Sequence, residues 1–280
     1  MLIGVVGAGT MGSGIAQSFA SNGFKVLLYD MSDNILSKGI DSIDKSLNRM
    51  VNKKRFTSDL ASEYIQNIKT TTDMNVLIDC DLIIEAATEN INIKKKIFQD
   101  LDTMVKDSCI LASNTSSISI NELADSTNRA DKIIGMHFMN PVPIMKLVEV
   151  IQIKRTSNDT LKLILDLSSQ LNKIPVTCLD SPGFISNRIL MPMINEAIYS
   201  LMEGVATKEA IDEIMVLGMS HPMGPLKLAD LIGLDVCLSI LNVLKEGFNG
   251  NSKYEPCPLL VQKCNEGKLG RKTGEGFYRY

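Results

Sequence analysis

The sequence lacks the signals that mark metal-bound, exported and membrane-spanning proteins. Its six cysteines form no CxxC pair and have no nearby histidines that could complete a zinc site. No stretch approaches the roughly 20 consecutive apolar residues that a membrane helix needs. The glycine-broken start has neither the basic region nor the cleavage site of a signal peptide. We therefore expect a soluble, cytoplasmic protein with reduced thiols, without a metal and without a membrane partner.

An excess of positive charge is also lacking. The 29 lysines and arginines are outnumbered by 32 acidic residues, which gives a formal net charge of -3. An extended nucleic-acid surface is usually basic, so no nucleic-acid partner is expected. Any anionic ligand must instead be bound by a local cluster of basic side chains.

The composition that remains is that of an ordinary globular protein without internal repeats. Its 280 residues, 45% hydrophobic and 22% charged, are enough for two domains with separate cores. Short apolar runs alternate with helical patterns over the first part, which is typical of βαβ units and a mostly parallel sheet. The expected strands are Leu2–Val6, Lys25–Tyr29, Asp81–Glu85, Ile110–Ser113, Lys132–His137, Leu147–Ile151 and Pro175–Cys178.

The pattern changes after Ser181-Pro182-Gly183. Beyond this point the apolar spacing is helical, as in residues 189–202 and 208–217, and no clear strand follows. The sequence therefore predicts an α/β fold. A Rossmann-like, doubly wound, mostly parallel sheet occupies residues 1–181, and a smaller all-α domain occupies residues 182–280.

A long helical pattern follows the second expected strand. One side repeats apolar residues at helical spacing, including Leu36, Ile43 and Leu47. The other side carries basic residues: Lys38, Lys45, Arg49, Lys53, Lys54 and Arg55. We predict a basic helical arm over about residues 33–66. A solvated helix face and a site for a phosphate-rich ligand explain such a run equally well.

The segment Gly7-Ala8-Gly9-Thr10-Met11-Gly12 has the spacing of a dinucleotide-binding turn. It follows an apolar strand and opens a helical pattern, as that motif requires. Gly7 permits the tight turn, Gly9 removes a side chain that would block the pyrophosphate, and Gly12 lets the helix approach the strand. We expect the five residues Gly7, Gly9, Thr10, Met11 and Gly12 to bind the cofactor, with its phosphates at the positive end of the helix dipole.

Asp30 ends the second expected strand, at a distance from the glycine turn where an acid accepts hydrogen bonds from the adenosine ribose. A carboxylate at this position repels a 2′-phosphate, and the following residues 31–34 contain no arginine to bind one. The sequence therefore favours NAD over NADP as the cofactor, although a surface turn would also accommodate an aspartate.

The chain has only two histidines, which narrows the search for a proton-transferring group. His137 closes an apolar strand, whereas His221 lies in a turn rich in proline and glycine. A pKa near 6.5 suits imidazole to acid/base work near neutral pH. Glu149 lies in an apolar run where a buried acid needs a partner, and a carboxylate can orient and stabilise a protonated histidine. A structural histidine and an outward-facing Glu149 fit the same pattern.

Polar residues Asn114-Thr115-Ser116-Ser117 follow the expected strand Ile110–Ser113. Ligands of open α/β sheets bind at the carboxyl ends of the strands, which is where this segment lies. It is a candidate ligand-binding loop, and an ordinary polar connection is the alternative.

Together these motifs resemble the short-chain 3-hydroxyacyl-CoA dehydrogenase family. The matching segments are GAGTMGSGIAQ from Gly7, ASNTSSISI from Ala112, GMHFMNPVPIMKLVEV from Gly135, SPGFISNRI from Ser181, HPMGP from His221 and GRKTGEGFY from Gly270. They follow one another over nearly the whole chain, and the HFxNPxPxMKLVEV pattern is far more specific than a glycine turn. The resemblance implies reversible hydride transfer between NAD(H) and C3 of a short acyl-CoA, such as acetoacetyl-CoA.

The resemblance also implies roles for individual residues. His137 becomes the general acid/base and Glu149 its partner, while Ser116 and Asn187 contact the reacting oxygen or support the histidine. The remaining assignments are Asn140 and Ser116 beside the nicotinamide, Glu89 and Lys94 at the cofactor ribose, Asp30 at the adenosine, and Ser46 and Lys53 at coenzyme A. A homodimer, or a higher homo-oligomer, is implied through the C-terminal domain.

Two other functions fit parts of the pattern. A free 3-hydroxyacid dehydrogenase of related architecture would commonly use a lysine instead of a His/Glu pair, and would not need the basic arm. A non-catalytic NAD-binding relative would be expected to have lost His137 or Glu149, and both are present.

Overall fold

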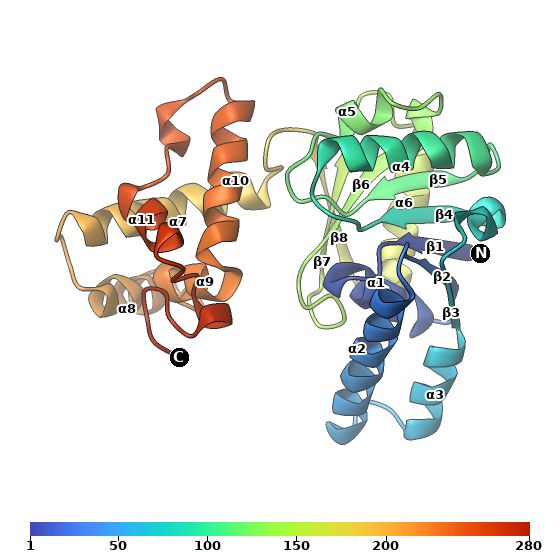
Figure 1. Ribbon diagram of the computed structural model, residues 1–280, viewed down its shortest axis with the longest axis horizontal. Coiled ribbons are helices and arrows are strands. Elements are labelled where there is room, and N and C mark those ends of the chain that lie inside the picture. The colour runs from blue at the N-terminus through green and yellow to red at the C-terminus, as the bar shows by residue number, and fades with distance from the viewer. The chain divides into compact units, whose positions relative to one another are not determined.

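The chain folds into two compact units, Met1–Asp180 (unit 1) and Ser181–Tyr280 (unit 2). The computed structural model describes residues 1–280, and Figure 1 shows it coloured along the chain. Each unit has a hydrophobic core of its own. No helix is both long enough and apolar enough to cross a membrane.

Unit 1 contains one eight-stranded sheet with the strand order β3-β2-β1-β4-β5-β6-β7-β8. All neighbouring strands are parallel except β6 and β7, which pair antiparallel. The order reverses between β1 and β4, as in a doubly wound dinucleotide-binding fold. The predicted fold class is confirmed. The strands are β1 (Leu2–Val6), β2 (Lys25–Tyr29), β3 (Ile68–Thr71), β4 (Leu82–Glu85), β5 (Ile110–Ser113), β6 (Ile133–Phe138), β7 (Leu147–Gln152) and β8 (Ile174–Leu179).

The sequence patterns did not predict β3. Its four residues, Ile-Lys-Thr-Thr, contain a single apolar side chain, and Lys69 and Thr70 are exposed. The strand pairs only with β2 at the edge of the sheet. An edge strand is half solvated, so it needs no continuous apolar run and leaves only a weak signal in the sequence.

Helices cover the sheet of unit 1. Residues on alternate positions of the strands, such as Ile3 and Val26, share a core with Phe19 and Ile164 from two of these helices. The helices are α1 (Thr10–Ala20), α2 (Asp33–Asn52), α3 (Ser58–Gln66), α4 (Ile91–Met104), α5 (Ile120–Ala124) and α6 (Asn158–Gln170), with short 3₁₀ turns at Met74–Asp79 and Ala130–Lys132.

Helices α2 and α3 form a pair that extends away from the sheet, as Figure 1 shows. The pair is closed by the rings of Phe56 and Tyr64, which pack edge to face with centroids 5.4 Å apart. At 1.5 Å per residue the 20 residues of α2 span about 30 Å. Leu47 on α2 is buried, whereas Lys45 and Arg49 beside it are exposed.

Unit 2 consists of helices packed around an apolar core that includes Ile194, Leu226 and Leu241. The helices are α7 (Ser186–Met202), α8 (Lys208–Met219), α9 (Pro225–Ile232), α10 (Leu234–Gly247) and α11 (Pro258–Asn265), with 3₁₀ turns at Ser252–Tyr254 and Arg271–Thr273. Two buried aspartates link segments of unit 2 through backbone hydrogen bonds. Asp212 on α8 accepts one from the N–H of Leu226, and Asp230 on α9 accepts one from the N–H of Phe277 near the C-terminus.

Candidate active site

The sheet of unit 1 brings several candidate segments to one edge. In the parallel register Val6 pairs with Glu85, Glu85 with Ser113, and Ser113 with Gly135. The segments that follow β1, β4 and β5 therefore leave the sheet at the same level, and His137 lies two residues beyond Gly135 on β6. This is the carboxyl edge, where open α/β sheets bind their ligands.

The glycine turn has the geometry that a dinucleotide requires. Gly7 has a φ of +102°, and a Cβ added there would lie 2.7 Å from the carbonyl oxygen of Ala86. A Cβ on Gly12 would lie 1.8 Å from the carbonyl oxygen of Gly7, so helix α1 approaches the turn as only glycine allows. A Cβ on Gly9 would meet nothing within 4 Å, which leaves open space before the N-terminus of α1. A pyrophosphate fits this space, with Thr10 and Met11 in the first helical turn.

Asp30 contacts the glycine turn directly. Its Oδ2 accepts a hydrogen bond of 2.9 Å from the backbone N–H of Ala8, and its Oδ1 accepts a longer one from Ser32. Asp30 is half-buried at the end of β2. The carboxylate thus supports the turn as well as placing a negative charge beside it.

His137 and Glu149 form a buried pair. The antiparallel register of β6 and β7 places the two residues directly opposite each other, so their side chains lie on the same face of the sheet. Nδ1 of His137 lies 3.0 Å from Oε2 of Glu149, and the two residues are 8% and 4% exposed. The thiol of Cys178 on β8 lies 3.8 Å from the other oxygen, Oε1. A carboxylate only accepts hydrogen bonds, so Nδ1 of His137 is the donor to Glu149.

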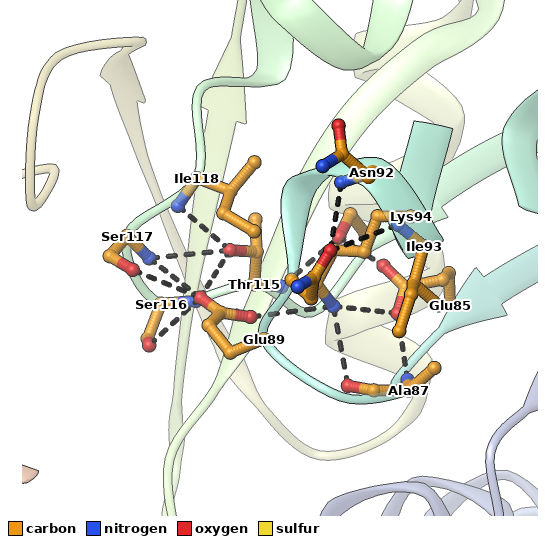
Figure 2. Close-up of polar contacts among 12 residues, drawn as sticks. Glu85, Ala87, Glu89, Asn92, Ile93, Lys94, Thr115, Ser116, Ser117 and Ile118 are labelled. Atoms are coloured by element: carbon orange, nitrogen blue, oxygen red, sulfur yellow. Dashed lines mark hydrogen bonds and ion pairs between the residues drawn. The ribbon is translucent and has the colours of Figure 1, made fainter. Parts of the chain in front are cut away.

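A second charged cluster joins β4, β5 and α4, as Figure 2 shows. Glu85 at the end of β4 is fully buried; its Oε2 accepts a 2.6 Å hydrogen bond from the hydroxyl of Ser113, and its Oε1 accepts one from the N–H of Ala87. Nζ of Lys94 lies 2.6 Å from Glu85 Oε1 and 3.4 Å from Glu89 Oε2. Lys94 is 1% exposed, so its charge is balanced inside the protein.

Glu89 connects this cluster to the loop after β5. Its Oε1 accepts hydrogen bonds from the hydroxyl of Thr115 at 2.6 Å and from the backbone N–H groups of Ser116 at 2.9 Å and Ser117 at 3.1 Å. Burial raises the pKa of Glu89, but the charge of Lys94 and these hydrogen bonds outweigh it and hold the pKa below its usual range. An ionised Glu89 therefore sets the position of Ser116.

The sequence patterns did not single out Asn114 as a structural link. Its side-chain oxygen accepts a buried 2.9 Å hydrogen bond from the backbone N–H of Phe138, the residue after His137. The loop of Ser116 is thereby tied to the strand of His137. A polar residue at the end of a buried strand was the only signal of this link in the sequence.

The remaining candidates come from the segment after β6, from α2 and from unit 2. Asn140 is exposed just after β6, Ser46 is half-buried on α2, and Lys53 is exposed at the end of α2. Asn187 is buried in the first turn of α7, in unit 2. Their assignments to the nicotinamide, to coenzyme A and to the reacting oxygen stay predictions, as does the contact of Glu89 and Lys94 with a cofactor ribose.

The sheet order, the glycine turn and the buried His/Glu pair define a dinucleotide-dependent oxidoreductase. Comparison with known proteins gives the family. The NAD-binding domain of 3-hydroxyacyl-CoA dehydrogenase matches residues 2–181, and the C-terminal domain of the same family matches residues 183–280. The chain belongs to the 3-hydroxyacyl-CoA dehydrogenase family, and NAD is its cofactor. The predicted family and cofactor are confirmed.

Individual relatives match over their full length. A probable 3-hydroxybutyryl-CoA dehydrogenase from Deinococcus radiodurans is 52% identical, with 100% of both chains covered. A 3-hydroxybutyryl-CoA dehydrogenase from Clostridioides difficile is 51% identical and covers 100% of this chain and 99% of its own. The crystal structure of (S)-3-hydroxybutyryl-CoA dehydrogenase from Ralstonia eutropha superimposes with a TM-score of 0.96 at 49% identity, covering 100% of this chain and 98% of that one.

Proposed function

We propose that this protein interconverts acetoacetyl-CoA and 3-hydroxybutyryl-CoA with NAD(H). Relatives named for that activity are about half identical to it over the whole chain. The observation that carries the proposal is the 3.0 Å contact between His137 and Glu149 at the carboxyl edge of the sheet that bears the glycine turn. A hydride transfer to a ketone needs one proton donor, and this pair is built to supply it.

The pair has a defined division of labour. Glu149 accepts from Nδ1, which sets the tautomer and orientation of the ring and stabilises the imidazolium form. In the reducing direction His137 donates the proton at Nε2 to the oxygen forming at C3, and in the oxidising direction it accepts that proton. When bound, NADH supplies the hydride. Both side chains are buried, which limits the access of water to the hydrogen bond between them.

Ser116 is the second group that we assign to the reacting oxygen. The Glu89 carboxylate accepts from its backbone N–H, and also lies 3.3 Å from its hydroxyl, so the residue is held in place before a substrate arrives. To stabilise negative charge on the reacting oxygen, the hydroxyl turns its single proton from the long 3.3 Å hydrogen bond with Glu89 to that oxygen. The predicted role of Asn187 is of the same kind.

The acyl-CoA is assigned to the basic arm formed by α2 and α3. Lys38, Lys45, Arg49 and Lys53 are exposed along or just after α2 in a protein of net charge -3. Phosphates of coenzyme A are attracted to such a local positive surface. Ser46 and Lys53 are the residues that we expect to contact the nucleotide portion.

A direct assay tests the proposal. The loss of NADH absorbance is followed with acetoacetyl-CoA and, separately, with free acetoacetate at equal concentration. We expect turnover with the thioester and little with the free acid, because only the thioester reaches the basic arm. Equal rates would favour a free 3-hydroxyacid dehydrogenase, and NADH binding without turnover of either compound would favour a non-catalytic relative.

We also infer that unit 2 forms a homodimer. Large apolar side chains are exposed on and near α8, with Val205 73%, Leu217 80% and Met219 62% exposed. A mostly apolar cavity of about 360 Å³, lined by Met193, Val205 and Ile214 among others, opens in the same region. Exposed apolar surface of this kind marks association sites. Analytical ultracentrifugation of the wild type and of Leu217→Glu tests this: a dimer that dissociates in the variant is expected, and a monomeric wild type would contradict it.

A further inference from the structure

Lys173 is a buried lysine without a carboxylate partner. It precedes β8 and is 8% exposed, and burial lowers the pKa of its ammonium group. Its Nζ donates to two backbone carbonyls, that of Val142 at 2.5 Å and that of Met145 at 2.7 Å. Lys94, the other buried lysine of unit 1, is balanced by Glu85 and Glu89 instead. A buried ammonium is costly unless it makes hydrogen bonds, and the two carbonyls supply them. What needs explaining is why a lysine, and not an apolar residue, occupies this buried position.

The two carbonyls belong to the connection between the strands of the proposed catalytic pair. Residues 139–146 join β6, which carries His137, to β7, which carries Glu149. The N–H groups of Ile144 and Met145 both bond to the carbonyl of Pro141 and close a turn. The carbonyls of Val142 and Met145 receive their hydrogen bonds from Lys173. The lysine therefore ties both ends of the turn to the start of β8.

The same turn is packed against the cofactor helix. Val142 is 2% exposed, and a Cβ added to Gly14 on α1 would lie 2.9 Å from its Cβ and 3.0 Å from its Cγ2. Gly14 is thus a glycine because the turn occupies the space beside it. Any displacement of the turn changes the surface on which the second turn of α1 rests.

We propose that Lys173, building on the function proposed above, is a positioning residue for cofactor binding. It holds the Pro141–Lys146 turn against Gly14 of α1, and so keeps the dinucleotide half of the site in register with the His137/Glu149 pair. Lys173 touches neither the substrate nor the reacting atoms. Loss of Lys173 would shift the turn and helix α1 relative to the His137/Glu149 pair. In enzymes, a displacement of about 1 Å between reacting groups can lower the rate by about 10².

Lys173→Met tests the proposal, because methionine keeps the length of the side chain and removes the charge and the donors. The matched control is Lys162→Met, which replaces an exposed lysine on α6. NADH affinity is measured by the fluorescence of bound NADH. The constants kcat and KM are measured with acetoacetyl-CoA as the substrate. We expect Lys173→Met to bind NADH about tenfold more weakly, while KM for acetoacetyl-CoA changes less than about twofold. The control should match the wild type.

A second series does not depend on that variant folding. Gly14→Ala pushes α1 away from the turn and should weaken NADH binding, whereas Gly14→Ala combined with Val142→Gly removes the opposing Cβ and should recover part of the affinity. A folded Lys173→Met that binds NADH as Lys162→Met does would overturn the proposal. So would a Gly14→Ala variant with unchanged affinity. A wild type that binds NADH but turns over no acyl-CoA would instead contradict the proposed function alone.

Discussion

The two charged clusters of unit 1 occupy the same edge of one sheet but differ in how their members meet. His137 and Glu149 lie 12 residues apart on adjacent antiparallel strands and face each other through the register of the ladder. Glu85, Lys94 and Glu89 meet because helix α4 follows β4 in the chain and its Lys94 side chain reaches back to Glu85 at the end of that strand. One cluster holds an imidazole, which can both donate and accept a hydrogen bond. The other surrounds its lysine with acceptors.

This difference indicates that burial of charge serves two purposes here. In the β6–β7 pair the carboxylate orients a histidine, which the proposed chemistry requires. In the Glu85 cluster Lys94 offsets part of the charge of two carboxylates, and Glu89 fixes the Thr115–Ser117 segment, which is a requirement of the architecture. Substitutions in the first cluster should therefore mainly affect turnover. Those in the second should mainly affect stability, and they should affect turnover only through the position of Ser116.

His137→Gln gives the largest expected effect. Removing the general acid/base should lower kcat by about 10² to 10⁴, while NADH binding is unchanged because the glycine turn lies on β1 and α1. Stopped assays at high enzyme concentration measure the residual rate, and NADH fluorescence measures binding. His137→Gln combined with Glu149→Gln should be no slower, since both residues act through the same proton. If kcat fell by less than about tenfold, His137 would not be the general acid/base.

Lys94→Met should act on stability. It leaves Glu85, which is fully buried, without a counter-charge, and removing one partner of a buried pair costs about 3–5 kcal/mol. The neighbouring Lys95 is the matched control, because its pair with Glu122 is partly exposed and should contribute less than about 1 kcal/mol. Urea unfolding compares Lys94→Met with Lys95→Met. Equal losses in the two variants would mean that the Glu85 cluster has no special structural role.

The choice between NADH and NADPH tests whether the negative charge of Asp30 at the edge of the sheet excludes a 2′-phosphate. The wild type should prefer NADH to NADPH in kcat/KM, because the Asp30 carboxylate repels a 2′-phosphate. Asp30→Asn removes the charge and keeps an oxygen that can accept from Ala8 N–H. The ratio of kcat/KM for NADH to kcat/KM for NADPH should then fall by about tenfold, the equivalent of about 1.4 kcal/mol. A wild type that prefers NADPH would contradict the assignment.

Lys53→Ala gives the smallest expected effect, since Lys53 is exposed. A screened surface contact contributes about 0.2–1 kcal/mol, so KM for acetoacetyl-CoA should rise by a few-fold at most, with kcat nearly unchanged. An N-acetylcysteamine thioester lacks the nucleotide portion and cannot reach α2. Wild type and variant should react equally with this analogue. An equal defect on both substrates would show that the substitution acts through the fold.

Several parts of the site could be predicted because their signals are local. Gly12 is required by a contact within the turn, with the carbonyl of Gly7, and Gly7 adopts a positive φ that favours glycine, although the distant carbonyl of Ala86 also lies close to it. His137 and Glu149 stood out because polar residues are rare in apolar strands. The edge strand β3 and the link from Asn114 to Phe138 left no comparable signal.

The sequence by itself determined the alternation of strands and helices, the dinucleotide turn and the identity of the residues able to transfer a proton. The tertiary structure alone decided which of them meet. Glu149 faces His137 because β7 runs antiparallel to β6 in one register, and a shift by one residue would turn it to the opposite face. Lys94 and Lys173 are both lysines in polar segments, and only the fold shows that both are buried, one against carboxylates and the other against carbonyls. Burial and pairing depend on segments far apart in the chain, which local patterns do not encode.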